Sequence, residues 1–309
     1  MHAANAADSS STPASAGALS FVGGRSEGAE RMYRVAFQGA PGAYSEEAVL
    51  RACGDDAQPV PLRENRDVAD AVADGAVDLG VLPVENTIAG SVPATYDAII
   101  ARPQLQAIGE LVLPIHHCVL GPPGSSLETL RTVESHPIAL AQCTAFFARH
   151  PAIHARAAYD TAGAASDVAR AQDPARGALA SRLAAHRYAL TVLASDVEDR
   201  ADNQTRFLVV SRTPRPQSAG VLTRTILVLT VMNRPGALLA LLTPLADHGL
   251  NMTKLESRPA GEPWAYRFVL EFEHLLGDPN VAEAMDAIRA AARSCHVVGT
   301  FAIDEAGAF

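Results

Sequence analysis

The sequence predicts an α/β protein in which two lobes with a cleft between them are followed by a smaller ferredoxin-like domain. Two observations lead to this fold class. Short apolar strands alternate with helices from Tyr33 to Ser211, the order typical of sheets with parallel strands. From residue 223 onward the order changes to β-α-β-β-α-β, which is the order of a ferredoxin-like unit.

The two lobes are inferred from the order of their strands and helices. In the first lobe we expect strands over 34–38, 59–62, 79–84 and 108–121, with helices over 45–53, 67–75 and 91–100. In the second lobe we expect helices over 142–150 and 161–171 and strands over 155–159 and 177–181. A polar loop over 200–206 then precedes a strand over 207–211, late enough to return to the first sheet. Lobe 1 is therefore placed at about 32–108 and 195–212, and lobe 2 at about 109–194.

The rest of the chain divides into a linker, the ferredoxin-like unit and a tail. Residues 213–222 are polar with proline and glycine, as in linkers. In the unit at 223–304 we expect strands over 223–231, 250–258, 264–273 and 296–303 and helices over 233–248 and 281–292. Residues 1–31, rich in alanine, serine and glycine, are expected to be a disordered tail.

The composition argues against several functions. The chain has 25 lysines and arginines against 34 aspartates and glutamates, and its net charge of −9 argues against nucleic-acid binding. Lys254 is the only lysine, so a Schiff-base enzyme would have a single candidate. No apolar run approaches the roughly 18 residues needed to cross a membrane, and residues 1–31 lack a signal-peptide pattern, so we expect a cytoplasmic protein. Because the four cysteines are scattered without regular spacing, we expect neither disulfides nor a zinc site. His116-His117 is the only histidine pair, and its place in a strand-like apolar run favours a structural or substrate-adjacent role over metal ligation.

Three polar motifs lie beside predicted apolar strands. Their polar residues are Glu85, Asn86, Thr87 and Ser91 in VENTIAGSV, Ser135 and Gln142 in ESHPIALAQC, and Asn203, Thr205 and Arg206 in DNQTRF. Exposed helix N–H groups after a strand make an anion site. Each motif taken alone is also explained by capping residues at an ordinary turn.

The full set of motifs resembles a known family. GAPGAYSEEA, PVENTIAGSV, ESHPIALAQC, DTAGAA, DNQTRF, PGAL and ESRP occur in the order seen in prephenate dehydratase with a C-terminal ACT regulatory domain. The resemblance extends from residue 32 to about residue 304, and Thr87 stands where the family often has serine. It implies two α/β lobes like those of type II periplasmic binding proteins, and conversion of prephenate to phenylpyruvate, water and carbon dioxide without cofactor or metal.

The resemblance also assigns roles to particular residues. It implicates Thr205 as the main catalytic residue, with Glu85, Asn86, Ser135 and Gln142 as further active-site groups. Thr87, Ser91, Asn203, Arg206 and Thr161 are expected to bind the substrate.

The chemistry of the reaction suits these residue types. The leaving hydroxide needs a hydrogen bond that strengthens as its bond breaks, and the Thr205 hydroxyl suits this task. Glu85 is a candidate acid if burial raises its pKa. The departing carboxylate suits an apolar wall with neutral donors, whereas Arg206 or helix N–H groups near Ser91 suit the unreactive pyruvyl carboxylate.

The C-terminal motifs imply regulation. ACT domains of this kind resemble side-by-side dimers that bind L-phenylalanine, and a homodimer or homotetramer is therefore expected. A backbone amide near Gly236 is expected to approach the ligand carboxylate, and Asn251 and Glu256 its ammonium group. The residues implicated are Gly236, Ala237, Leu238, Asn251, Glu256, Ser257, Arg258 and Pro259.

Three other functions remain open at this stage. An arogenate dehydratase would act on the amine instead of the ketone of the side chain, and the segment at 160–165 is a candidate neighbour of that group. A two-lobed solute-binding protein would need an export signal and would not explain the ACT unit. An amino-acid-sensing regulator without catalysis would not need an intact DNQTRF motif.

Overall fold

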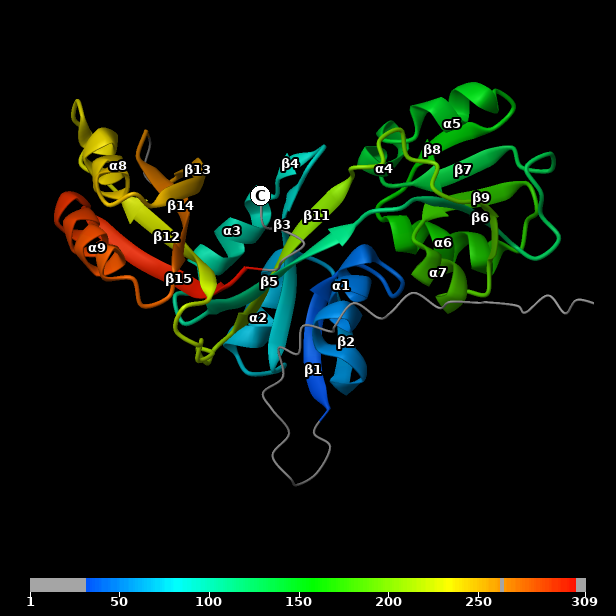
Figure 1. The fold of residues 1–309 in the computed structure, drawn as a ribbon. Helices are drawn as coiled ribbons and strands as arrows, with labels where there is room; N and C mark the ends of the chain where they lie inside the picture. Colours follow the sequence, from blue (N-terminus) through cyan, green and yellow to red (C-terminus); the bar gives the residue numbers. More distant parts are fainter. Residues whose placement is uncertain (1–31, 262–263, 304–309) are drawn as a thin grey trace, which may run out of the picture.

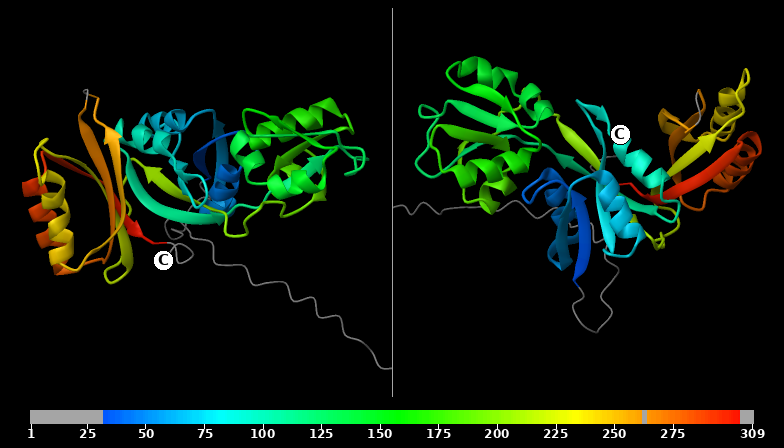
Figure 2. Two further views of the ribbon diagram at one scale, coloured as in Figure 1. Left: turned by 90° about the horizontal axis from the view of Figure 1, so that it is seen from above. Right: turned by 180° about the vertical axis from the view of Figure 1, so that it is seen from behind.

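The computed structural model describes residues 32–261 and 264–303, and the tail expected at 1–31 lies outside them. Two α/β lobes and an ACT domain lie in a row, with lobe 1 in the middle (Figures 1 and 2). The predicted two-lobe architecture with a C-terminal ferredoxin-like domain is confirmed. None of the helices in the described part of the chain is long and apolar enough to cross a membrane.

Lobe 1 is built on a mixed sheet with strand order β2-β1-β3-β11-β5. The strands are β1 (Tyr33–Gln38), β2 (Ala57–Leu62), β3 (Leu79–Asn86), β5 (Gln106–Pro114) and β11 (Gln204–Ser211), and a short β4 (Gly90–Ser91) pairs with β3. Strands β1, β2 and β3 are parallel, whereas β11 runs antiparallel to both β3 and β5. The chain thus returns to the centre of this sheet after completing lobe 2.

Apolar side chains cover both faces of the lobe 1 sheet, as expected for a sheet between helices. Helix α1 (Tyr44–Cys53) packs on one face, and α2 (Asn65–Ala73) and α3 (Pro93–Ile100) pack on the other. A short 3-10 turn, η1 (Gly54–Asp56), links α1 to β2. Along β11 the two faces alternate, since Phe207 and Val209 join the α1 side and Leu208 and Val210 the other.

Lobe 2 contains a five-stranded sheet with strand order β10-β6-β9-β7-β8. Its strands are β6 (Cys118–Gly121), β7 (Thr132–Ser135), β8 (His154–Ala157), β9 (Arg176–Ala180) and β10 (Thr191–Ala194). Its helices are α4 (Pro137–Ala141), α5 (Thr144–Arg149), α6 (Thr161–Ala171) and α7 (Arg182–Arg187). Two segments, 115–117 and 195–203, cross between the lobes.

Two details of lobe 1 differ from the sequence prediction. The single strand expected over 108–121 is divided into two strands, β5 and β6 (Cys118–Gly121). Because β5 pairs with β11 of the lobe 1 sheet as far as Pro114, lobe 2 begins after residue 114 and not near residue 109. The segment expected as a loop over 200–206 already contains the start of β11, which includes Thr205 and Arg206. The second difference decides which way these two side chains point.

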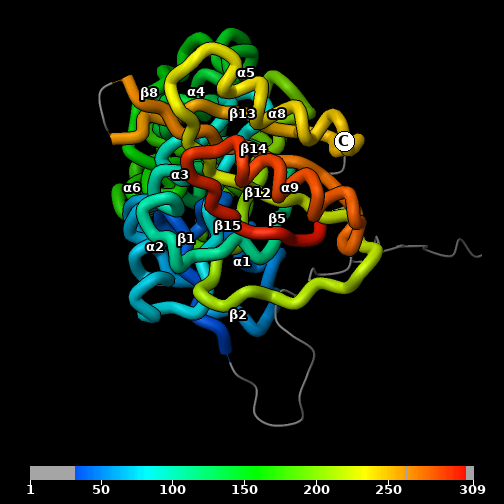
Figure 3. The backbone as a smooth tube through the Cα atoms, turned by 90° about the vertical axis from the view of Figure 1, so that its left-hand side faces the viewer, coloured from blue at the N-terminus to red at the C-terminus, as the bar shows by residue number. Residues whose placement is uncertain are grey.

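The ACT domain is an antiparallel sheet with strand order β13-β14-β12-β15. The elements are β12 (Leu222–Thr230), α8 (Ala237–Asp247), β13 (Asn251–Pro259), β14 (Tyr266–Leu275), α9 (Pro279–Ala291) and β15 (Ser294–Ala302). Both helices lie on the side of the sheet away from lobe 1 (Figures 1 and 3). Helix α8 begins at Ala237 and not at the expected position after Asn233, because Gly236 takes a left-handed conformation at its N-cap.

The inner face of the ACT sheet shares a hydrophobic core with lobe 1. Ile226, Val228 and Phe301 of the ACT domain join the same buried cluster as Leu208 and Val210 of β11. Gly299 of β15 lies so close to Ala107 of β5 that a Cβ atom there would collide with backbone. The regulatory domain is therefore packed directly on the sheet that carries Thr205.

Candidate active site

Two adjoining cavities lie between the lobes. Their volumes are about 310 and 650 Å³, and both are bordered by Gln38, His136, Tyr159 and Asp160. The smaller cavity is lined by Asn86 and Thr205 of lobe 1, by Gln142 and Thr161 of lobe 2 and by His117 of a crossing segment. Four of the residues proposed from the motifs, Asn86, Gln142, Thr161 and Thr205, therefore line one cavity, although they come from segments that are far apart in the sequence.

Asn86 and Thr205 are direct neighbours across strands β3 and β11. The Asn86 side-chain oxygen accepts hydrogen bonds from the backbone N–H groups of Ile88 and Ala89, at 3.0 and 2.8 Å. These two bonds fix the orientation of the amide. Its nitrogen therefore faces Thr205 Oγ1 at 3.0 Å and donates to it.

This contact determines what the Thr205 hydroxyl can do. A hydroxyl has one proton and two lone pairs. Because its oxygen accepts from Asn86 and its proton has no acceptor among the described residues, the proton can be donated to a group in the cleft. The hydroxyl is thus set up as a donor, and Asn86 can stabilise negative charge that develops on Oγ1.

A chain of hydrogen bonds connects Asn86 to the second lobe. Asn203 is buried, and its side-chain oxygen accepts from Asn86 at 2.8 Å while its amide nitrogen donates to Gln142 Oε1 at 3.1 Å. His117 Nε2 lies 3.0 Å from the same Gln142 oxygen. Because that oxygen can only accept, Nε2 carries the proton. His117 Nδ1 lies 2.7 Å from the Tyr44 hydroxyl, which also donates to the His116 carbonyl at 2.9 Å.

His117 is held as a neutral imidazole. Burial lowers its pKa below the usual value of 6.5, although the hydrogen bond with Gln142 and the nearby Glu198 act in the opposite direction. Its backbone N–H also donates to Glu198 Oε2 at 2.8 Å, which ties the two crossing segments together. Sequence analysis noted His117 only as part of a histidine pair, because its partners are distant in the chain.

The glycine-rich loop after β1 docks lobe 1 against lobe 2. Ala40 N–H donates to Asp160 at 3.0 Å, Ser181 donates to the Gly42 carbonyl at 2.6 Å, and Arg187 forms an ion pair with Glu46. A Cβ atom on Gly42 would lie 2.8 Å from Ala184 Cα, and its φ of +88° is one that glycine readily adopts. The GAPGAYS motif thus sets the width of the cleft, a role that sequence analysis missed.

The charges that line the cavities are few. Among residues 32–261 and 264–303, no lysine or arginine borders the smaller cavity, and Arg63 is the one lysine or arginine that borders the larger. Asp160 borders both cavities, and Thr161 stands beside it in the first turn of the 11-residue helix α6. Helix N–H groups there can bind an anion.

Glu85 and Arg206 do not line the cleft. They are also neighbours across β3 and β11, but they point to the opposite side of the sheet from Asn86 and Thr205, and their side chains lie 3.0 Å apart. Their remaining contacts are with Glu110 and with residues of the ACT domain. The roles expected for Glu85 as an acid and for Arg206 as a carboxylate-binding group do not fit these positions.

Other predicted residues are structural in this arrangement. Ser135 is fully buried and donates to the Leu179 carbonyl at 2.6 Å, and Thr87 donates to the Asp202 carbonyl at 2.9 Å. Ser91 donates to Glu256 of the ACT domain at 2.6 Å, and so does not face the substrate cleft. Asn203 supports the cleft from behind instead of lining it.

The predicted effector residues fall into two groups. Gly236, Leu238, Asn251, Ser257 and Pro259 have at least part of their surface exposed on α8 and β13, whereas Ala237 is buried. Glu256 and Arg258 point toward lobe 1, where their partners are Ser91 and Asp97. The expectation that Glu256 takes the ammonium group of a ligand therefore does not fit its position.

Comparison with known proteins identifies the family. Residues 35–215 match the prephenate dehydratase family and residues 225–292 match the ACT domain. The chain belongs to the prephenate dehydratase family and carries a C-terminal ACT domain. A prephenate dehydratase of Amycolatopsis methanolica is 37% identical over 88% of this chain and 89% of its own length. Arogenate dehydratase 2 of Petunia hybrida is 36% identical over 88% of this chain and 72% of its own length.

Two solved structures are similar to most of this chain. A prephenate dehydratase of Arthrobacter aurescens in complex with L-Phe has a TM-score of 0.81 and 30% identity, covering 87% of this chain and 89% of that chain. A protein described as GqqA, a novel type of quorum quenching acylase, has a TM-score of 0.82 and 34% identity, covering 88% of this chain and 98% of that chain.

The buried neutral His117 predicts a pH dependence of stability. Below about pH 6.5 the unfolded chain binds a proton on this imidazole, while the folded protein does not until its lower pKa is reached. As the pH decreases, His117 should therefore lower the free energy of unfolding by up to about 1.4 kcal/mol per pH unit. In His117→Gln this contribution should be absent, which urea unfolding between pH 5 and 7.5 would measure.

The matched control is His154→Gln, because the His154 side chain is exposed on β8. This variant should keep the wild-type slope. Tyr44, Glu198 and His116 face His117 and are unchanged in both variants. Equal slopes for wild type and His117→Gln would contradict the assignment of a buried neutral imidazole.

Proposed function

We propose that this protein converts prephenate to phenylpyruvate, with loss of water and carbon dioxide, and is regulated by L-phenylalanine. The observation that carries the proposal is the Thr205 hydroxyl, which lines the cleft, accepts from Asn86 and has no acceptor for its own proton among the described residues. Loss of the ring carboxylate and the ring hydroxyl together makes an aromatic ring, so no electron-carrying cofactor is required.

Thr205 acts on the leaving hydroxide. A threonine is too weak an acid to act alone as the proton source, so its contribution is a hydrogen bond that strengthens as the carbon–oxygen bond breaks. The Asn86 amide supports this hydrogen bond, because it donates to Thr205 Oγ1 and can stabilise negative charge that develops on that oxygen. Glu85 does not take part in this step, because its carboxylate lies on the other side of the sheet.

The departing carboxylate is placed against the apolar wall. Ile115, Ile138 and Phe207 border the smaller cavity, and no lysine or arginine in the described part of the chain does. A tight ion pair here would stabilise the substrate more than the transition state, whose charge moves into the ring. The Gln142 amide nitrogen has no acceptor among the described residues and is a neutral donor for this group.

The unreactive pyruvyl carboxylate is placed at the start of α6. Thr161 borders the smaller cavity, and the free N–H groups of the first helical turn favour an anion. Arg63 of the adjoining cavity can add a charge contact from lobe 1. These groups replace Arg206, whose guanidinium is occupied by carboxylates on the ACT side.

Arogenate is the second candidate substrate, and Asp160 is the observation that favours it. Arogenate carries an ammonium group where prephenate has a ketone, and Asp160 borders the cavity next to Thr161. The Asp160 carboxylate, however, already accepts from Ala40 across the cleft. We therefore place prephenate first.

Incubation of the purified protein with each substrate separately decides between them. We expect phenylpyruvate from prephenate with a higher kcat/KM than L-phenylalanine from arogenate, and chromatography would measure both products. A higher kcat/KM on arogenate would reverse the order, and the absence of both products would refute the proposed reaction.

The ACT domain is proposed to respond to L-phenylalanine through a dimer or tetramer. Strand β13 is an edge strand of its sheet, and an edge strand offers unpaired backbone groups to a partner. Met252 and Leu255 on this strand and Leu239 on α8 are exposed apolar side chains, 38%, 37% and 67% accessible. Side-by-side pairing with a second copy would cover them and bring β13 and α8 of two subunits together.

Millimolar L-phenylalanine should inhibit the enzyme and raise its melting temperature, because a ligand that binds only the folded state stabilises it. Light scattering after size exclusion should give the mass of a dimer or tetramer. A monomer whose rate and melting temperature do not respond to L-phenylalanine would refute this part of the proposal.

We also place the enzyme in the cytoplasm. All four cysteines, Cys53, Cys118, Cys143 and Cys295, are free thiols, and free thiols suit a reducing compartment.

Replacement of Thr205 tests the mechanism directly. Thr205→Ala should lower kcat by a factor of about 10² or more, because one oriented donor to a charged transition state is removed. Thr205→Ser keeps the hydroxyl and should retain most of the activity. Steady-state kinetics would measure both, with melting temperatures to show that the variants fold. A folded Thr205→Ala enzyme with wild-type kcat would rule out the assignment.

A further inference from the structure

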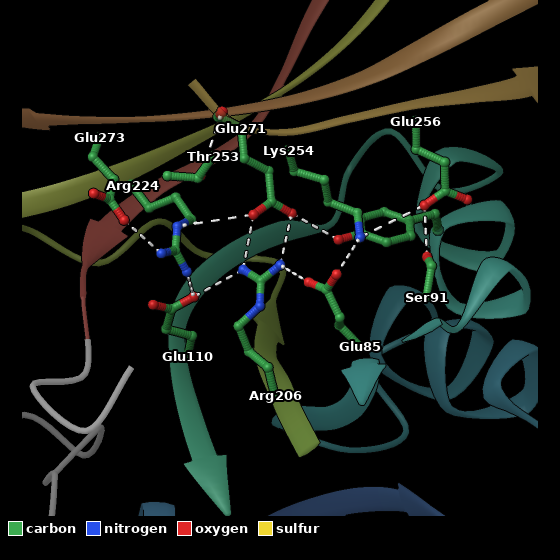
Figure 4. Close-up of polar contacts among 11 residues, drawn as sticks. Glu85, Ser91, Glu110, Arg206, Arg224, Thr253, Lys254, Glu256, Glu271 and Glu273 are labelled. Atoms are coloured by element: carbon green, nitrogen blue, oxygen red, sulfur yellow. Dashed lines mark hydrogen bonds and ion pairs between the residues drawn. The ribbon is translucent and has the colours of Figure 1, made fainter. Parts of the chain in front are cut away.

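We propose that a buried ion-pair network around Lys254 and Arg206 transmits effector binding on the ACT domain to Asn86 and Thr205 in the cleft. The proposal rests on the function above, since it concerns how that cleft is regulated. The network joins residues of lobe 1 to residues of the ACT sheet (Figure 4).

The network begins on the inward face of β13. Side chains alternate along a strand, so Lys254, Glu256 and Arg258 point toward lobe 1 while Leu255 and Ser257 point away. Each inward side chain has a lobe 1 partner. Lys254 Nζ lies 3.3 Å from Glu85, Glu256 accepts from Ser91 at 2.6 Å, and Arg258 pairs with Asp97 at 2.5 Å. A movement of β13 therefore acts on lobe 1 at three points.

Arg206 lies at the centre of the network. It is 9% exposed, and its guanidinium contacts Glu85 at 3.0 Å, Glu110 at 3.1 Å and Glu271 of β14 at 2.8 Å. The Tyr96 hydroxyl donates to Glu271 at 2.7 Å. Burial alone would raise the pKa of Glu271, but Arg206 holds it below its usual value, so this carboxylate stays ionised.

The network continues toward β12 through a second arginine. Arg224 contacts Glu110 at 2.5 Å and Glu273 at 2.7 Å, so Glu110 of β5 lies between the two guanidinium groups. Both lobe 1 edge strand β5 and ACT strands β12 and β14 are thereby connected to Arg206 (Figure 4).

The link to the cleft follows from strand register. Glu85 and Arg206 are one cross-strand pair of β3 and β11, and Asn86 and Thr205 are the next. The two pairs point to opposite sides of the sheet and are separated by a single peptide in each strand. The register also shifts immediately after Arg206, at a bulge where pairing is locally disrupted. A displacement of Glu85 or Arg206 therefore changes the geometry between Asn86 and Thr205.

The interface between lobe 1 and the ACT domain contains more buried charge than attachment of the domain requires. The ACT sheet already shares an apolar core with lobe 1, and a buried ion pair is often no more stabilising than apolar packing of the same volume. Lys254, Arg206 and Arg224 face the carboxylates of Glu85, Glu110, Glu256, Glu271 and Glu273. Lys254 bridges Glu85 and Glu256, so loss of its charge would leave Glu85 with Arg206 and Glu256 with Arg258 and would remove the cation between the two carboxylates.

The decisive variant is Lys254→Met, which keeps the aliphatic stem and removes the charge. Activity without effector should stay within about three-fold of wild type, whereas the inhibition at saturating L-phenylalanine should weaken by about five-fold or more, the lower range of allosteric couplings. Calorimetry should show that L-phenylalanine still binds. Lys254→Arg keeps the charge and should keep the inhibition. The control is Arg289→Met, which removes an exposed cation of α9 that pairs with Asp286.

Each result separates this inference from the proposed function. Unchanged inhibition in Lys254→Met would overturn the network proposal alone, and complete loss of L-phenylalanine binding would overturn it too, by making Lys254 a ligand contact. A wild-type enzyme that is active but not inhibited would refute regulation and this inference together, while an inactive wild type would refute the function. If Lys254→Met does not fold, Tyr96→Phe provides the test, because it removes only the hydrogen bond to Glu271. This variant should also weaken the inhibition by L-phenylalanine. Unchanged inhibition in Tyr96→Phe would overturn the proposal.

Discussion

The antiparallel pairing of β11 with β3 is the constraint on which the rest of the structure depends. β11 comes from the far end of lobe 2 and enters the lobe 1 sheet between β3 and β5. This entry closes the excursion through lobe 2 and brings Thr205 beside Asn86. Because side chains alternate, the same pairing must place Arg206 and Glu85 on the opposite side, against the ACT domain. A pair that faces the cleft and a pair that faces the ACT domain thus come from two successive residues of each strand.

The distribution of charge follows from this division. The protein has a net charge of −9 and yet is proposed to bind a dianion, so attraction cannot come from an overall positive field. The cation nearest to Thr205 in the sequence is Arg206, and three carboxylates neutralise it on the ACT side. Among the described residues, the smaller cavity is lined by amides, hydroxyls, imidazoles, a helix N-terminus and the carboxylate of Asp160. The neutral donors among them can stabilise a moving charge without holding the reacting carboxylate in place.

Much of the fold could be predicted from the sequence, since alternating strands and helices identify the lobes and the order of elements identifies the ferredoxin-like domain. The structure brings Thr205, Asn86, Gln142 and Thr161 to one cavity. The side-chain directions of Glu85 and Arg206 were not predicted, because the strand expected over 79–84 stops before Glu85 and 200–206 was interpreted as a loop. Once Arg206 lies on β11, a period of two sets it opposite Thr205. For His117 the sequence favoured a structural or substrate-adjacent role, but its partners Tyr44 and Gln142 could not be predicted, because they are 73 and 25 residues away.

Lobe position and catalytic geometry are connected through Gln142. Its side-chain oxygen accepts from His117 on one crossing segment and from Asn203 on the other. Asn203 in turn accepts from Asn86, which donates to Thr205. Gln142 belongs to lobe 2 and Asn86 to lobe 1, so separation of the lobes would break this chain between Gln142 and Asn203, while Asn86 would stay oriented by the N–H groups of Ile88 and Ala89. The donor geometry at Thr205 is therefore built within lobe 1 alone, and lobe 2 adds Gln142 and Thr161 from the other side of the cavity.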